Sequence, residues 1–267
     1  MARPFLKWAG GKRRLLGQYR PFFPGAVARY HEPFAGSAAV FFEIAPGRAT
    51  LADSNGALIN CFTIVRDQVE PLIRRLDDLQ ARHDCRKYYE FRDRYNSEGI
   101  DPVERAALFI YLNHTCYNGL YRVNSRGHFN VPAGRYVRPR ISDPDGLREA
   151  SAALASTRLL TRRFDACVAD AERGDFVYVD PPYHALHAAS FTSYTAEGFG
   201  EAEQRELATV VDRLHAAGCR VMVSNSDTPL IRELYAPYRI VPIRAARAIN
   251  SAPGGRGPVA EVLVLNY

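Results

Sequence analysis

The sequence lacks any apolar run that approaches the length of a membrane span. A helix needs about 20 consecutive apolar residues to cross a bilayer, and no run in this chain of 267 residues comes near that length. The amino-terminal segment also lacks the apolar core of a signal peptide, because Arg3 and Lys7 interrupt it. Both absences predict a cytoplasmic protein with no membrane partner.

Cysteine is scarce and lacks any motif spacing. No two of the five cysteines share the short separation of a zinc or redox motif. Their odd number and wide scatter predict reduced thiols. We therefore expect no metal site. The five positions are Cys61, Cys85, Cys116, Cys167 and Cys219.

Acidic residues are missing from three long stretches, residues 1–31, 115–142 and 234–260. These stretches hold 16 of the 35 basic residues and none of the 29 acidic ones, so the rest of the chain has a net charge of −10. Charge segregated in this way predicts a basic face that binds a polyanion such as double-stranded DNA. The alternative is a chance distribution of basic residues over solvated loops.

Short apolar strands alternate with helices at both ends of the chain, which predicts an α/β fold with one doubly wound sheet. The continuous apolar run at residues 176–179 is typical of a buried parallel strand. The predicted strands are residues 29–32, 50–52, 176–179, 220–223, 239–243 and 260–265. The predicted helices between them are residues 38–44, 55–65, 201–217 and 228–234.

The middle of the chain has a different pattern. Helical periodicity is predicted over residues 69–83, 86–95, 103–112 and 145–156. Between the last two, residues 117–136 are rich in Gly, Asn, Arg and aromatics, which predicts loops with room for a hairpin. We therefore divide the chain into a sheet domain, residues 1–68 and 157–267, and a basic, mainly helical domain, residues 69–156, inserted after the second strand.

Small residues follow the first strand, in the segment Glu32-Pro33-Phe34-Ala35-Gly36-Ser37-Ala38. Such a turn lets a ligand approach the backbone at a helix N-terminus. Asp53 ends the next strand, where a carboxylate can bridge the two hydroxyls of a ribose. Together they predict a cofactor that contains adenosine. The alternative is a purely structural turn with an Asp that caps the strand. The segment does not form the complete glycine motif of dinucleotide-binding proteins, which disfavours a nicotinamide enzyme.

The most specific motif is Asp180-Pro181-Pro182-Tyr183, directly after the strand at residues 176–179. Ligands in open α/β sheets bind outside the carboxyl ends of strands. The two prolines fix the backbone, so the carbonyl oxygens of Asp180 and Pro181 stand beside the carboxylate as acceptors. Acceptors that grip both hydrogens of a ring-conjugated amine would make its nitrogen more nucleophilic. Tyr183 could stack on that ring and face a sulfonium cation.

No strong general base is required at this motif, because the amine becomes acidic once it carries the methyl group. Its proton can leave late, to Asp180 or to water. Alignment of nucleophile, methyl group and sulfur in a line supplies the rest of catalysis. The alternative reading of the motif is a proline-rich strand exit with a capping Asp.

These motifs resemble those of the Dam-type DNA adenine methyltransferases (D12 class, alpha group) over nearly the whole chain. The resemblance implies a class I methyltransferase fold that uses S-adenosyl-L-methionine and releases S-adenosyl-L-homocysteine. The opening Pro4-Phe5-Leu6-Lys7-Trp8-Ala9-Gly10-Gly11-Lys12 is similar to the family's first motif. The implied cofactor contacts are Trp8, Lys12, Phe34, Gly36, Asp53, Phe164, Asp165 and Asp180. The implied catalytic residues are Asp180, Pro181, Pro182 and Tyr183.

Further segments carry the same resemblance. Residues 190–194 resemble the loop that closes over the target base, and Ser224-Asn225 resembles a strand-end motif. Residues 117–124 and 127–132 resemble the DNA-recognition segment. One departure is Ala38, where family members often have a second glycine. The implied DNA contacts are Lys7, Tyr117, Asn118, Leu120, Arg122, Asn124 and Arg135.

The target amine lies inside a duplex, so the adenine must swing out to react. Arg122 could pair with a guanine edge, and Leu120 could contact a thymine methyl group. Tyr117 could enter the space that the extruded adenine leaves in the base stack. Lys7 could reach a base or a phosphate. Packing of Tyr117 and Leu120 in the protein core is an equal alternative on the residues alone. The family commonly methylates GATC, which we take as a hypothesis for this chain.

Three rival functions are weighed. An RNA or protein amide methyltransferase typically has Asn where this chain has Asp180, and it lacks the Lys7–Lys12 opening. A non-catalytic DNA-binding relative is disfavoured, since Lys12, Asp53, Asp180 and Tyr183 are all present. In a nicotinamide enzyme, the Pro-Pro-Tyr segment after the strand at residues 176–179 would have no function. We expect a monomer, and a cognate restriction endonuclease is a candidate partner.

Overall fold

A computed structural model describes residues 2–184, 199–246 and 258–267. Within these ranges, seven strands form one sheet in the order β3-β2-β1-β4-β5-β7-β6. The five strands from β3 to β5 are parallel, and β7 runs antiparallel to both β5 and β6. The strands are β1 Tyr30–Glu32, β2 Ala49–Asp53, β3 Thr157–Thr161, β4 Phe176–Val179, β5 Arg220–Ser226, β6 Arg239–Ala246 and β7 Pro258–Leu265.

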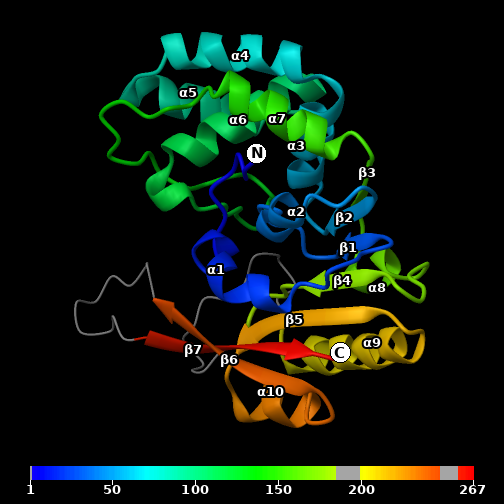
Figure 1. Ribbon diagram of the computed structural model, residues 1–267. Helices are drawn as coiled ribbons and strands as arrows, with labels where there is room; N and C mark the ends of the chain where they lie inside the picture. Colours follow the sequence, from blue (N-terminus) through cyan, green and yellow to red (C-terminus); the bar gives the residue numbers. More distant parts are fainter. Residues whose placement is uncertain (1, 185–198, 247–257) are drawn as a thin grey trace.

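Helices connect the parallel strands, as the predicted doubly wound α/β fold requires. Helix α9 lies beside β5, with α10 next to it (Figure 1). Among the described residues, the helices of this part of the chain are the 3-10 helices η1 Lys12–Arg14 and η2 Arg20–Phe22 and α1 Leu16–Tyr19, α2 Ala39–Ile44, α3 Gly56–Asp67, α8 Phe164–Cys167, α9 Glu201–Ala216 and α10 Pro229–Leu234. Helices α2 and α3 pack into one hydrophobic cluster, and α8, α9 and α10 pack into another. None of the helices described is long and apolar enough to cross a membrane.

A group of helices lies above the sheet in Figure 1, with α4 on its outer side. These helices come from the middle of the chain, as predicted. Three of them begin at an Asp that caps the helix, and in two cases Pro occupies the first turn, which is a favoured start. They are α4 Val69–Ala81, α5 Cys85–Tyr95, α6 Pro102–Thr115, the 3-10 helix η3 Tyr117–Gly119, and α7 Pro144–Leu154.

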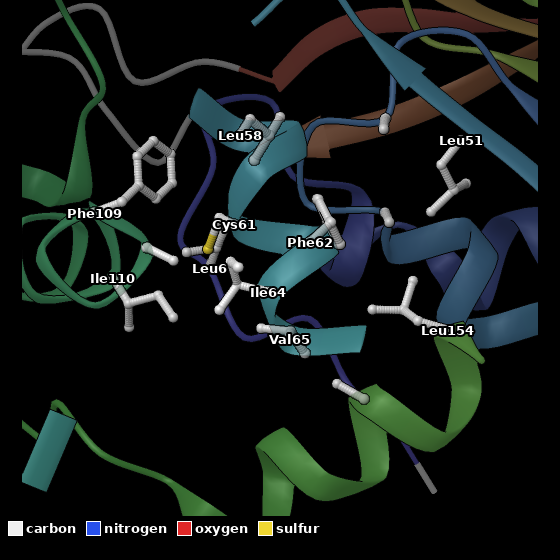
Figure 2. Packing of buried hydrophobic residues seen from close by; sticks show 14 of the residues in the cluster. Leu6, Leu51, Leu58, Cys61, Phe62, Ile64, Val65, Phe109, Ile110 and Leu154 are labelled. Carbon is white, nitrogen blue, oxygen red and sulfur yellow. The ribbon is translucent and has the colours of Figure 1, made fainter. Parts of the chain in front are cut away.

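Helix α3 joins the sheet to these helices. Figure 2 shows its buried face, from Leu58 to Val65, beside Phe109 and Ile110 of α6 and Leu154 of α7. One hydrophobic cluster runs from sheet residues such as Leu51 through α3 into α6. The division into two domains stays a prediction, and this shared core indicates that the two parts would not move freely against one another.

Several short elements were not predicted from the sequence, among them η1, α1 and η2. Strand β3 was not predicted, because its residues are largely half-buried or exposed and lack a continuous apolar run. The short helix α8 was also missed. Within residues 117–136 the backbone forms a small turn in which Val123 pairs with Phe129, and a second bridge joins Cys116 to Ala133. Boundaries elsewhere differ by a few residues, as helix ends usually do.

Candidate active site

Polar side chains gather at the edge of the sheet where the parallel strands end. Glu32 and Asp53 are the last residues of β1 and β2, and Asp180 follows β4 directly. Ser224 and Asn225, near the end of β5, are fully buried. This edge is where open α/β sheets bind ligands, so the structure brings the predicted acids of three strands to one crevice.

Asp180 is held by a cation and a hydroxyl. Its Oδ2 lies 2.7 Å from Nζ of Lys12, and its Oδ1 accepts a hydrogen bond of 2.7 Å from Oγ of Ser224. Lys12 is only 5% exposed, and its Nζ also donates to the carbonyl of Gly10 at 2.6 Å. A buried cation without a partner would cost several kcal/mol, so the pair fixes both side chains in the crevice.

Glu32 is a second carboxyl close to this pair. It is 2% exposed and accepts a hydrogen bond of 2.8 Å from the hydroxyl of Tyr30. Burial raises the pKa of Glu32 well above its ordinary value, and the nearby charge of Asp180 acts in the same direction. The neutral form of Glu32 is therefore favoured beside the charged pair of Lys12 and Asp180.

Tyr183 lies close to the pair of Lys12 and Asp180. Nζ of Lys12 stands 4.8 Å from the centre of its ring, and its hydroxyl donates a 2.9 Å hydrogen bond to Oε2 of Glu261. Burial raises the pKa of Tyr183 well above its ordinary value, so the phenol stays neutral and remains a donor. The carbonyl of Pro182 accepts a bond of 2.9 Å from Nε2 of Gln204, which anchors the exit of β4.

The turn after β1 approaches Trp8 closely. Gly36 has a φ of +48°, and a Cβ placed there would lie 2.9 Å from Cδ1 of Trp8. The backbone N–H of Gly36 donates to Oδ2 of Asp53 at 3.2 Å, and that of Asn55 donates to Oδ1 at 2.9 Å. Burial raises the pKa of Asp53. A small cavity lies between this turn and Asp180, lined also by Ala9, Gly10, Gly11 and Ser37.

Two predicted aromatic contacts of the cofactor meet further along the edge. The rings of Phe34 and Phe164 stack with centroids 5.4 Å apart and planes 22° apart. Phe199 packs edge-on against Phe34 at 5.7 Å. Asp165 is half-buried and accepts a bond of 3.1 Å from Nε of Arg163. Phe34, Phe164 and Asp165 are therefore close together, on the β2 side of the crevice.

Most predicted DNA contacts are exposed. They lie within residues 117–135, apart from Lys7, which lies in the amino-terminal segment. Tyr117 is 52% exposed, whereas Leu120 is half-buried and packs against the core. Nε of Arg122 donates to Oδ1 of Asn130 at 2.7 Å, which orients the guanidinium. The structure thus separates Tyr117, which is available to a ligand, from Leu120, which also contributes to packing. The other exposed members of the set are Lys7, Asn118, Asn124 and Arg135.

The amino-terminal segment with Lys7 and Trp8 is in contact with the predicted recognition segment. Trp8 stacks on Tyr121, with centroids 5.7 Å apart, and on Phe109 at 6.3 Å. The buried side chain of Asn113 accepts from the N–H of Lys7 at 2.8 Å and donates to the carbonyl of Lys7 at 2.6 Å. Its amide also donates to the carbonyl of Gly119 at 3.3 Å. The opening segment is therefore fixed to the predicted recognition segment.

The chain is similar in sequence to known proteins. A family profile for the D12 class N6 adenine-specific DNA methyltransferases matches residues 8–249. The chain is 41% identical to the Type II methyltransferase M1.LlaDCHI of Lactococcus lactis subsp. cremoris, over 99% of this chain and 95% of that protein. It is 37% identical to the DNA adenine methylase of Escherichia coli K12, over 98% and 95%. The chain belongs to the D12 class of N6 adenine-specific DNA methyltransferases.

This D12-class methyltransferase has the mixed α/β fold of the class I methyltransferases, as predicted. Its one departure from the expected motif has a structural counterpart, since Ala38 is fully buried and adopts the left-handed conformation with a φ of +53°. Glycine adopts that conformation without strain. Ala38 therefore adopts a strained conformation inside the core, and the lining of the cavity beside Gly36 continues with Ser37 and Ala39.

Two residues of the methyltransferase site were not singled out from the sequence. Glu261 reaches Tyr183 from β7, and Asn113 binds Lys7 from α6. Neither stands in a motif, so only the position of its strand or helix in the fold could reveal it. Residues 190–194, expected to close over the target base, lie outside the described residues. Within the described ranges, no cluster of three or more His, Cys, Asp or Glu could hold a metal ion.

Proposed function

We propose that this DNA adenine methyltransferase moves a methyl group from S-adenosyl-L-methionine to N6 of an adenine extruded from duplex DNA, within GATC. The observation that carries the proposal is the Asp180–Tyr183 exit of β4, with the carboxylate fixed by Lys12 and Ser224. The exit stands at the ligand-binding edge of the sheet. It combines hydrogen-bond acceptors with one aromatic face, which is what a flat amino-purine needs.

The residues present fit S-adenosyl-L-methionine. Trp8, Gly36 and the buried carboxyls of Glu32 and Asp53 surround the turn beside the cavity. Asp53 would hold the ribose hydroxyls, and Phe34, Phe164 and Asp165 would contact the adenine ring. Trp8 and Lys12 would border the methionine part. When bound, the cofactor supplies an electrophilic methyl group on a sulfonium.

Asp180 and Tyr183 would act on the target base. The carboxylate of Asp180 and the adjoining carbonyls would accept the two hydrogens of the amine, and Tyr183 would stack on the purine ring to hold it in line. Lys12 orients the carboxylate of Asp180 through the 2.7 Å contact. The proton released after transfer would leave to Asp180 or to water.

The exposed recognition segment would bind the duplex. Arg122, oriented by Asn130, would read a guanine edge, and Tyr117 would enter the space that the adenine leaves. Lys7 and Arg135 would contact bases or phosphates. We also propose that the protein is cytoplasmic and monomeric. A cognate endonuclease is proposed because a similar protein is named a Type II methyltransferase.

Incubation with radiolabelled cofactor tests the reaction and its substrate class. Wild-type protein is expected to label duplex DNA, whereas Asp180→Ala and Asp180→Asn are expected to bind DNA yet transfer no methyl group. The Asn variant is included because it keeps the shape of the side chain. The Ala variant removes the side-chain oxygens altogether and leaves Lys12 buried without this partner. Label appearing only in RNA, or full activity in either variant, would contradict the proposal.

The recognition sequence is tested in a host that lacks its own adenine methylase. Expression of the chain is expected to modify adenines at GATC, as mapped by methylation-sensitive sequencing. Modified adenines at other sites would refute GATC while leaving the activity intact.

A further inference from the structure

A carboxylate from the antiparallel part of the sheet reaches the catalytic edge. Strand β7 runs opposite to β5, and Glu261 near its start lies level with Ser226 at the end of β5. Parallel strands present only their carboxyl ends at this edge. The reversal of β7 therefore brings a residue from the beginning of a strand to the same place as Asp180.

Glu261 makes a directed contact with Tyr183. Its Oε2 accepts the hydroxyl hydrogen of Tyr183 at 2.9 Å. Burial raises the pKa of Glu261, while the positive charge of Lys12 and the bond from Tyr183 oppose that effect. The neutral phenol and its acceptor form a hydrogen bond that is stronger than a neutral pair when the carboxyl is charged.

The hydroxyl of Tyr183 also interacts with Ser224 and Tyr19, and Glu261 is the carboxylate that accepts its hydrogen. Nζ of Lys12 stands 4.8 Å from the ring centre, and Pro182 fixes the preceding backbone. The Tyr side chain can swing about its Cα–Cβ bond, which moves the hydroxyl and tilts the long axis of the ring. The hydrogen bond to Glu261 holds the hydroxyl in place and so limits this movement.

We propose that Glu261 is a positioning residue for methyl transfer, which acts by holding the hydroxyl of Tyr183 so that the ring faces the target base at a fixed angle. The inference rests on the proposed function, in which the base stacks on Tyr183. Displacement of reacting groups by about 1 Å can lower a rate on the order of 100-fold. A shift of the ring would affect the rate of transfer and not the affinity for the cofactor.

Single-turnover rates on duplex DNA test this role. Glu261→Ala and Tyr183→Phe are each expected to lower the rate constant on the order of 10- to 100-fold, with the KM for cofactor within about twofold of wild type. The double variant is expected to be no slower than either single variant, because both remove the same hydrogen bond. Multiplying effects in the double variant, or a wild-type rate in Glu261→Ala, would overturn the proposal.

Glu261→Gln separates positioning from proton transfer. Its amide oxygen can still accept the hydroxyl of Tyr183, so the variant is expected to recover most of the rate with the pH profile of the wild type. A proton acceptor would not be replaced by an amide. A Gln variant as slow as Glu261→Ala would therefore refute the positioning role.

A matched control comes from a similar pair remote from the crevice. The hydroxyl of Tyr238 donates to Oδ1 of Asp212 at 2.5 Å, and Asp212→Ala is expected to leave the rate unchanged. A loss of rate in this control equal to that of Glu261→Ala would contradict the inference. No transfer to DNA by wild-type protein would instead count against the proposed function, which keeps the two failures apart.

Discussion

Gly36 and Ala38 have nearly the same left-handed backbone, with φ of +48° and +53°, but different surroundings. The side of Gly36 that would carry a Cβ is filled by the indole of Trp8. The methyl group of Ala38 is accommodated in the core, where it is fully buried. A side chain is therefore excluded at one position by a neighbour and tolerated at the other at the expense of strain.

Gly36→Ala is expected to weaken cofactor binding about tenfold or more, since the added methyl group displaces Trp8 and the strained turn adds about 1–2 kcal/mol. Isothermal titration with S-adenosyl-L-homocysteine measures the effect. The matched change, Ala38→Gly, relieves backbone strain in the folded state. It also raises the conformational entropy of the unfolded chain, which opposes that gain with a similar free energy. It is expected to alter the free energy of unfolding by less than about 1 kcal/mol. Equal affinities in wild type and Gly36→Ala would refute this account.

The position of the proposed catalytic motif in the fold could be predicted from the sequence because its residues are consecutive. Asp180, two prolines and Tyr183 are consecutive, and the apolar strand before them fixes their place at the sheet edge. The ion pair of Asp180 with Lys12 spans 168 positions, and the bond between Tyr183 and Glu261 spans 78. Such pairs depend on tertiary structure, so no pattern in the sequence signals them.

Asn113 of helix α6 joins the amino-terminal segment to the predicted recognition segment. This one side chain satisfies both backbone groups of Lys7 and the carbonyl of Gly119. A Cβ at Gly119 would lie 2.7 Å from Cδ of Lys7, so the two segments are in close contact there. The backbone position of Lys7, which we propose to contact DNA, therefore depends on a residue of α6 that lies in the core.

Asn113→Ala is expected to lower the free energy of unfolding by about 2–3 kcal/mol, because three backbone groups lose a partner at about 1 kcal/mol each. Weaker binding to duplex DNA should accompany the loss. Urea denaturation and fluorescence anisotropy provide the two measurements. Asn60→Ala, which removes an exposed bond to the carbonyl of Pro102, serves as the control. A loss of stability no larger than that of the control would be evidence against the role of Asn113.

The elements of the middle segment could be predicted better than those of the sheet edge. Its helices are long, periodic and begin at Asp84, Asp101 and Asp143, which signal a helix start. Strand β3 has five residues, of which only Thr157 is buried. Its place is set by pairing with β2, which a sequence does not display.

The charge distribution of the whole molecule agrees with an interaction with DNA. The chain carries a formal net charge of +6, yet its acidic residues are absent from the recognition segment. Arg122, Arg126, Arg135 and Arg138 are all exposed within the acid-free stretch of residues 115–142. Contacts of this kind release counterions from DNA, so affinity depends steeply on salt.

Replacing both Arg135 and Arg138 by alanine is expected to reduce the slope of log Kd against log salt by about 2, since each phosphate contact contributes about 1. The paired control replaces Arg74 and Arg75, which are exposed on the outer helix α4 (Figure 1). Anisotropy titrations between roughly 50 and 200 mM salt give both slopes. An unchanged slope in the first variant, or an equal change in the control, would exclude this face as the DNA surface.

The order of the last strands has a consequence for synthesis. Strand β6 precedes β7 in the chain, but its only hydrogen-bonded neighbour among the described strands is β7, which lies between it and β5. On the ribosome, β6 therefore emerges before the strand that it must pair with. The antiparallel part of the sheet can form only after β7 has left the exit tunnel, and until then β5 presents an unpaired edge on which nascent chains can associate.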